Sequence, residues 1–135
     1  MKKILTSGLV VSAVLLAFAY ASLLLLPKLF PRVAEEYYNP AFVNDASRNF
    51  LYYVHAVVLA FALSWFWNRF KSALTGNSLM RGIELAFIYF VIATFPAMLM
   101  LYSTIDISLL AISTFLLYGF AQALMAGVIF SKMDK

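Results

Sequence analysis

The one histidine of this chain, His55, has the widest chemical range of its side chains. A histidine can change charge near neutral pH, ligate haem iron or hydrogen-bond a quinone-like head group. Tyr52 lies three residues earlier, so on a helix both side chains share a face and could join one polar network. The alternative is a ring satisfied by a neighbouring helix, a tyrosine or interfacial water, and we favour this structural role.

Three polar side chains recur every four residues late in the chain, at Thr114, Tyr118 and Gln122. On a helix they form one line, which should face protein or a wet cavity because an embedded polar group costs free energy unless it is paired. The line either borders a solute path or supplies hydrogen bonds between helices, and we favour the second. Pro96 removes the hydrogen bond to the carbonyl of Ile92, so we expect a kink there that acts as a hinge or a fixed bend.

The composition excludes several kinds of catalysis. Cysteine is absent, which removes disulfide, thiolate and iron–sulfur chemistry, and one histidine without a carboxylate cluster cannot complete a zinc or di-iron site within one chain. Glu84 is expected to pair with Arg81 or to reach toward the head groups rather than to couple protons. No charge lies near the centre of an apolar stretch, which argues against an ion-driven pump. We therefore assign no catalytic residue, no metal site and no cofactor.

These residues lie on a mostly apolar chain. Hydrophobic residues make up 64% of its 135 positions and charged residues 12%, against about half and a quarter in a soluble domain. Apolar runs occupy residues 4–26, 50–68, 83–102 and 105–130, and about 20 such residues cross a bilayer core. We predict an all-α fold, an integral membrane bundle of four transmembrane helices in a single domain over 1–135, with an outer loop at 27–49 and a cytoplasmic loop at 69–82.

Basic residues are shared unevenly between the two predicted sides. Seven lie on one side and three on the other: Lys2, Lys3, Arg69, Lys71, Arg81, Lys132 and Lys135 against Lys28, Arg32 and Arg48. Because basic loops stay in the cytoplasm, we expect both termini there, in a bacterial inner membrane. The first run also resembles a signal peptide cleaved after Ala21, but its 23 residues exceed a signal core of about 7–15, so we expect an uncleaved anchor.

The outer loop contains two prolines and several aromatic residues. Pro27 is expected to end the first helix, and Pro31 to keep the helix from resuming at once. Residues 32–49 are expected to form a short element in the outer membrane interface, where aromatic rings are favoured. The rings that mark it are those of Phe30, Tyr37, Tyr38 and Phe42.

Side chains that can accept a hydrogen bond from a first-turn amide predict the helix starts. Asn44 or Asp45 is expected to cap the second span, and Asn77 or Ser78 the third. Ser103 and Asp106 match a capping box for the fourth, which leaves only residues 103–104 between the last two spans. So short a link makes these two helices an antiparallel hairpin.

Small residues recur every four positions in each span. Helices in lipid associate where small side chains let their backbones approach, so each set predicts a contact face. The predicted faces are Ala13, Ala17 and Ala21; Ala56, Ala60 and Ser64; Ala93 and Ala97; and Gly119, Ala123 and Gly127. The last is the most specific, because glycine is a poor helix former and makes sense there mainly as a contact residue.

In size and span count the chain resembles small four-span bacterial inner-membrane proteins, many of them uncharacterised. The missing cysteines contradict the thiol-dependent vitamin K epoxide reductases, and the first span lacks the mid-membrane glutamate of the small multidrug exporters. We expect a non-catalytic scaffold or accessory subunit that associates with itself or with a larger membrane complex, with lipid and not nucleic acid as its surroundings. The alternative is a transporter or channel for a small or lipophilic solute, and a cofactor-binding enzyme is weakest.

Overall fold

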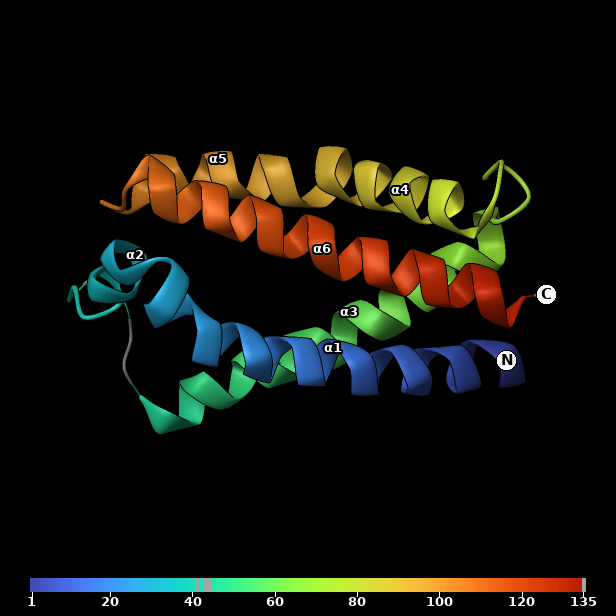
Figure 1. Cartoon of the computed structure of the whole chain (residues 1–135), viewed down its shortest axis with the longest axis horizontal. Coiled ribbons are helices and arrows are strands. Elements are labelled where there is room, and N and C mark those ends of the chain that lie inside the picture. Colours follow the sequence, from blue (N-terminus) through green and yellow to red (C-terminus); the bar gives the residue numbers. More distant parts are fainter. Residues whose placement is uncertain (41, 43–44, 135) are drawn as a thin grey trace.

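The computed structural model describes residues 1–40, 42 and 45–134, and all regular structure in these ranges is helical (Figure 1). The elements are α1 (Lys2–Leu29), α2 (Pro31–Glu36), α3 (Ala46–Phe70), α4 (Ser78–Tyr89), η1 (Phe90–Thr94), α5 (Phe95–Thr104) and α6 (Leu109–Met133). The segments α4, η1 and α5 follow one another without a break and form one rod.

Four of these helices are long and apolar enough to cross a membrane: Lys2–Leu29, Ala46–Phe70, Ser78–Thr104 and Leu109–Met133. At 1.5 Å per residue the shortest of them, with 25 residues, extends over about 38 Å, more than the hydrocarbon thickness of about 30 Å. The chain is therefore an all-helical membrane protein, and each of its spans is long enough to reach the head-group region.

The spans form two antiparallel pairs. In Figure 1 helix α1 packs along α3, and the α4–α5 rod packs along α6, whereas α6 makes fewer contacts with α1 and α3. Both termini lie at one end of the bundle, together with the α3–α4 loop, and α2 lies at the other end. The buried core draws on α1, α3, the α3–α4 loop, α4 and α6: Val11, Leu15, Ala56, Leu59, Ala60, Leu63, Trp67, Leu74, Leu85, Ala86, Ala123, Ala126 and Phe130.

Two predicted caps are confirmed. The Asp45 carboxylate accepts from the amide of Ser47 (3.1 Å) at the start of α3, and the Asn77 side chain accepts from the amide of Met80 (2.9 Å) at the start of α4. The other candidate for the α3 cap, Asn44, lies outside the described residues.

The predicted end of the first span at Pro27 is wrong, because α1 continues through Pro27 to Leu29. A proline in the last turn costs one backbone hydrogen bond, and the next turn still closes, with the Phe30 amide donating to the Leu26 carbonyl (2.8 Å). Nor does Pro31 delay the helix, since it is the first residue of α2, where its missing amide hydrogen costs nothing.

The predicted capping box at Ser103 and Asp106 is also wrong. Helix α5 continues to Thr104, so Ser103 lies in its last turn and its hydroxyl donates to the Met100 carbonyl (2.8 Å). The link between the last two spans is residues 105–108, and Ser108 caps α6 by accepting from the amide of Ala111 (3.1 Å). A serine near a helix end can cap the following helix or hydrogen-bond to the last turn of the preceding one, and here α5 continues past Ser103.

Helix α2 and the aromatic residues after it pack against the start of α6. The Glu36 carboxylate accepts from the amide of Ser108 (3.1 Å), and the Tyr37 ring lies 5.0 Å from that of Phe42 and 6.1 Å from that of Phe115. The segment after the first span is thus partly helical and is attached to the second helix pair.

Pro96 is accommodated by a π-helical turn. Five residues, Phe90–Thr94, form a π-helix that ends two residues before the proline, and the amide of Phe95 donates to the carbonyl of Phe90, five positions back. A π turn leaves the proline ring free of the preceding carbonyls. The disturbance that the sequence predicts at Pro96 therefore lies in the turn before it.

Candidate functional site

The structure brings together two of the predicted polar residues, Tyr52 on α3 and Tyr118 on α6. Their hydroxyl oxygens lie 3.0 Å apart, and that of Tyr52 is also 3.3 Å from the Ala19 carbonyl oxygen of α1. The ring of Phe18 stacks on that of Tyr118 at 5.2 Å between centroids. This cluster joins α1, α3 and α6 and so ties the two helix pairs together.

His55 does not join this cluster. Its side chain is exposed on α3, and among the described residues it has no hydrogen bond to Tyr52 or to any other group. Its exposure places the ring on the outer surface of the bundle.

The remaining residues of the predicted polar path have separate surroundings. The Thr114 hydroxyl donates to the Ala111 carbonyl of its own helix (2.7 Å), and Pro96 is exposed on α5. Gln122 is 1% exposed, and its side-chain nitrogen has no hydrogen-bond partner among the described residues. The three polar residues of α6 therefore lie in one line along the helix without forming one hydrogen-bonded chain.

Two of the four small-residue faces point into the bundle. Ala56, Ala60 and Ser64 of α3 are fully buried. On α6 Gly119, Ala123 and Gly127 are also buried, and a Cβ at Gly127 would lie 2.8 Å from the Gly82 Cα of α4. A Cβ at Gly119 would lie 2.9 Å from the Thr94 methyl carbon of the π turn.

The other two predicted faces are not buried against another helix of this chain. Ala13 and Ala17 of α1 are exposed and Ala21 is half-buried, and Ala93 and Ala97 in the third span are exposed. Helix α1 instead turns a neighbouring face to α3, with buried residues Ser7, Gly8, Val11, Ser12, Leu15 and Ala19. A spacing of four identifies a face without saying which of several faces meets the partner helix.

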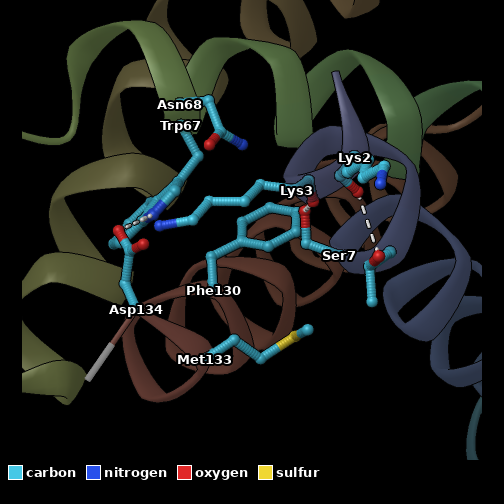
Figure 2. A pocket seen from close by; sticks show the side chains of 9 residues that line it. Lys2, Lys3, Ser7, Trp67, Asn68, Phe130, Met133 and Asp134 are labelled. Carbon is cyan, nitrogen blue, oxygen red and sulfur yellow. Dashed lines mark hydrogen bonds between the residues drawn. The ribbon is translucent and has the colours of Figure 1, made fainter.

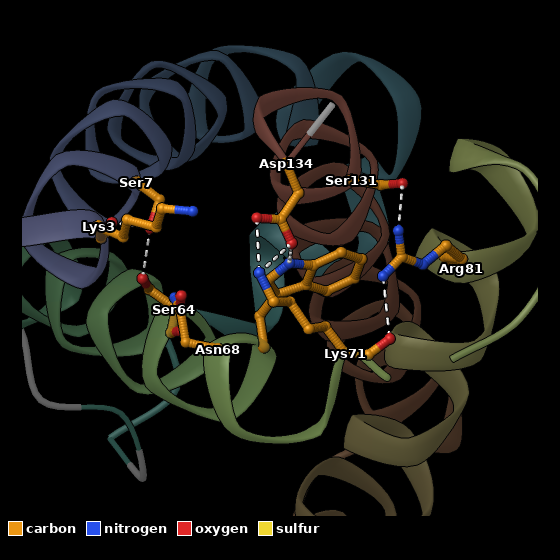
Figure 3. A network of polar contacts seen from close by, with 9 residues as sticks. Lys3, Ser7, Ser64, Asn68, Lys71, Arg81, Ser131 and Asp134 are labelled. Carbon is orange, nitrogen blue, oxygen red and sulfur yellow. Dashed lines mark hydrogen bonds and ion pairs between the residues drawn. The ribbon is translucent and has the colours of Figure 1, made fainter. Parts of the chain in front are cut away.

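A polar network that the sequence did not suggest lies at the end of the bundle that holds both termini (Figure 3). Asp134, directly after α6, accepts from the ammonium of Lys71 (2.7 Å) and from the indole nitrogen of Trp67 (3.1 Å). Because Trp67 lies in the last turn of α3 and Lys71 directly follows that helix, these contacts connect the second helix pair to the first.

Arg81 extends the network to α4. Its guanidinium carbon lies 4.6 Å from the centroid of the Trp67 ring, a cation–π contact. Its two terminal nitrogens donate to the Lys71 carbonyl (2.9 Å) and to the Ser131 hydroxyl (3.4 Å). The expected partner of Arg81, Glu84, instead accepts from the amide and hydroxyl of Thr75 (2.8 and 3.2 Å), so the predicted pair is wrong. The α3–α4 loop folds back and supplies nearer donors to the carboxylate.

The pKa of Asp134 is lower than that of a free carboxyl group. Partial burial alone would raise it, but the hydrogen bonds from Lys71 and Trp67, with the charges of Lys71 and Lys3, outweigh that effect. Asp134 is therefore an anion at neutral pH, and both of its oxygens have donors.

A pocket of about 260 Å³ opens beside this network, between α1, α3 and α6 (Figure 2). Its lining is Lys2, Lys3, Thr6, Ser7, Trp67, Asn68, Phe130, Met133 and Asp134. In Figure 2 the Lys3 side chain extends across it toward Asp134, with the Phe130 ring on the α6 side. A pocket with lysines at its edge and aromatic walls suits an anionic group attached to an apolar body.

The sequence held partial signals of this site. Lys2, Lys3 and Lys71 bear on topology, and Trp67 lies near the end of an apolar run. Their convergence depends on how α1, α3 and α6 meet, which no local pattern reports. Among the described residues no group of three histidine, aspartate or glutamate side chains gathers as metal ligands would.

No protein family matches this chain, and no curated protein or solved structure matches it either.

Proposed function

We propose that this chain is a packing subunit, by which we mean a non-catalytic scaffold or accessory subunit that associates with itself or with a larger membrane complex. It would lie in a bacterial inner membrane with both termini in the cytoplasm. The observation that carries the proposal is the division of its small-residue faces. Two of them are used inside the bundle, and the outward Ala13–Ala17 and Ala93–Ala97 faces are left for another helix.

Association through an outward face is testable with paired substitutions. Replacing Ala13 and Ala17 with Ile should reduce co-purification or self-assembly in mild detergent, measured by native mass spectrometry, because branched side chains keep helices apart. The matched control replaces the exposed Leu9 and Leu24 of the same helix with Ile. Assembly that survives the alanine replacements, and likewise those at Ala93 and Ala97, would contradict the proposal.

The charge distribution supports the proposed orientation. The end that holds both termini carries most of the basic residues, and α2 at the opposite end carries few. Because the sequence contains no cysteine, a single introduced cysteine reports its own side without background. In intact cells a membrane-impermeant maleimide should label an Arg32→Cys variant and should label a Lys132→Cys variant only after permeabilisation. The reverse pattern would overturn the orientation.

A second candidate function, transport of a small or lipophilic solute, is favoured by Gln122. Its amide nitrogen has no hydrogen-bond partner in the described residues although the side chain is buried in a membrane span, and such groups often mark solute paths. A transporter would show solute flux in liposomes that a Gln122→Leu variant abolishes. A packing subunit would show no flux, and the leucine would leave its unfolding unchanged or more difficult, since an unpaired amide is removed.

A further inference from the structure

We propose that the pocket between α1, α3 and α6 binds the phosphate head group of an anionic phospholipid. The inference needs the chain to span a membrane and does not depend on whether the chain is a packing subunit or a transporter. A free phosphate anion shares the relevant chemistry and is distinguished by the experiment.

Charge is the first argument. Lys2 and Lys3 line the pocket, are exposed, and form no ion pair among the described residues. The carboxylate in the lining, Asp134, is already paired with Lys71 at 2.7 Å. The single negative charge of Asp134 is thus shared by Lys71 and Lys3, which leaves an excess of positive charge at the pocket, and each lysine near a membrane surface attracts anionic lipid.

Neutral hydrogen-bonding groups lie beside these charges. Thr6, Ser7 and Asn68 also line the pocket. The Thr6 and Ser7 hydroxyls donate to the Lys2 and Lys3 carbonyls (2.9 and 2.7 Å), which holds the turn that carries both lysines, and the Asn68 amide has a second N–H that could donate to a phosphate oxygen. The Asn68 amide donates to the Ser64 carbonyl at 2.8 Å, which holds one edge of the pocket in position.

The remaining walls argue for a lipid over a hydrated ion. Trp67 and Phe130 are almost fully buried and close the inner side of the pocket, and Met133 is half exposed at its edge. Phosphate alone would gain nothing from the exposed Met133 side chain, whereas the glycerol and ester region of a phospholipid would cover it. The volume of about 260 Å³ is near the lower limit of small-ligand pockets, about 300 Å³, which suits a head group whose acyl chains stay outside.

The position of the pocket fits this ligand. It lies at the ends of three apolar spans, where Trp67 and the lysines would meet the head-group layer. Basic pockets between helix ends at this depth are recognised sites for acidic head groups.

The experiment titrates the purified full chain in neutral detergent with phosphatidylglycerol, with phosphatidylcholine of the same acyl chains, and with inorganic phosphate, and measures bound ligand by native mass spectrometry. We expect phosphatidylglycerol to bind at least about tenfold more tightly than phosphatidylcholine. A Lys2→Gln, Lys3→Gln double variant should lose most of this difference. A Lys28→Gln, Arg32→Gln double variant, with the same charge change at exposed positions near the opposite end, should keep it.

Other outcomes overturn the inference. Equal losses in the two double variants would show attraction to total charge without a site. Equal binding of both lipids would show an apolar groove that does not recognise phosphate. The pocket would belong to a soluble anion if the wild type retained inorganic phosphate, the Lys2 and Lys3 replacements abolished this retention, and phosphatidylglycerol were not preferred over phosphatidylcholine. Because the replaced lysines are exposed, the variants are expected to fold, and unchanged thermal unfolding checks this.

Discussion

The two helix pairs differ in how the helices within each pair contact one another. Between α4 and α6 the backbones touch, since a Cβ built on Gly127 would lie 2.8 Å from the Gly82 Cα. Between α1 and α3 the contacts are made by side chains. A Cβ at Gly8 would lie 2.6 Å from the Phe61 ring, and the hydroxyls of Ser7 and Ser64 lie 2.6 Å apart.

This difference shows that small residues serve two purposes in membrane helices. At the α4–α6 contact glycine permits close backbone packing, where dispersion replaces the missing hydrophobic effect. At the α1–α3 contact the small residues make room for a ring and a buried hydroxyl pair. We expect the first contact to tolerate substitution least, because a backbone cannot move aside and a ring can.

The largest effect is expected for Gly127→Leu. Its side chain would meet the backbone of α4, so we expect a loss of about 3 kcal/mol in the free energy of unfolding, measured by denaturant titration in detergent. A Leu117→Met replacement on the exposed side of α6 is the control. Equal stability of Gly127→Leu and the parent would contradict the claim that the backbone contact between α4 and α6 tolerates substitution least.

A smaller loss, about 1 kcal/mol, is expected for Gly8→Ala, since the half-buried Phe61 ring can turn away from the added methyl group. Thermal unfolding of Gly8→Ala and of the double variant with Phe61→Leu tests the mechanism. The leucine should recover part of the loss. If Gly8→Ala is as damaging as Gly127→Leu, the distinction between ring and backbone contacts is wrong.

Ser64→Ala removes the hydroxyl pair of the α1–α3 contact. The Ser64 hydroxyl also lies 3.0 Å from the Ile4 carbonyl oxygen, and Ser7 keeps its own bond to the Lys3 carbonyl (2.7 Å) when Ser64 is lost. We expect a cost of about 0.6 to 1 kcal/mol, the usual value of a hydrogen bond between membrane helices. A double-mutant cycle with Ser7→Ala measures the coupling, and additive effects would show that the two hydroxyls do not interact.

The smallest effect concerns the contact between the pairs at Asp134. Because the pKa of Asp134 is lowered in the folded chain, the ionised carboxylate adds to the free energy of unfolding. This contribution is fully present above the ordinary aspartate pKa of about 4 and is lost as the pH falls through the lower pKa of the folded chain. The pair is partly exposed, with Lys71 at 33% and Asp134 at 16%, so we expect less than about 1 kcal/mol. Asp134→Asn should remove this part of the pH dependence of unfolding between about pH 5 and 2. Parallel pH profiles for the two proteins would contradict it.

The sequence predicts those features whose physical cause lies within one turn of the chain, such as the helix caps. The Asp45 and Asn77 caps follow from side chains that accept the amides of the turn they precede. The errors at Pro27 and Ser103 share a cause, since each residue is compatible with a helix end but tolerated within the last turn. Which of two neighbouring residues ends a helix depends on small free-energy differences that packing can reverse.

The candidate site was much less predictable. The three-residue spacing predicts that Tyr52 shares a polar network with His55, whereas in the structure Tyr52 is hydrogen-bonded to Tyr118 on another helix. No pattern in the sequence points to Asp134, yet it is the residue through which α6 contacts the end of α3. Contacts between helices far apart in sequence depend on crossing geometry, which the spacing along one helix does not contain.

The sequence by itself determined that this protein is an all-helical membrane chain with four spans, because hydropathy over a bilayer's thickness is a sum over consecutive residues. It also marked the faces along which these helices could pack. Only the tertiary structure decided which faces meet, pairing α1 with α3 and α4 with α6 and leaving the Ala13–Ala17 and Ala93–Ala97 faces outside. The physical reason is that lipid is as apolar as the side chains, so choosing among small faces rests on close backbone fit and a few polar contacts.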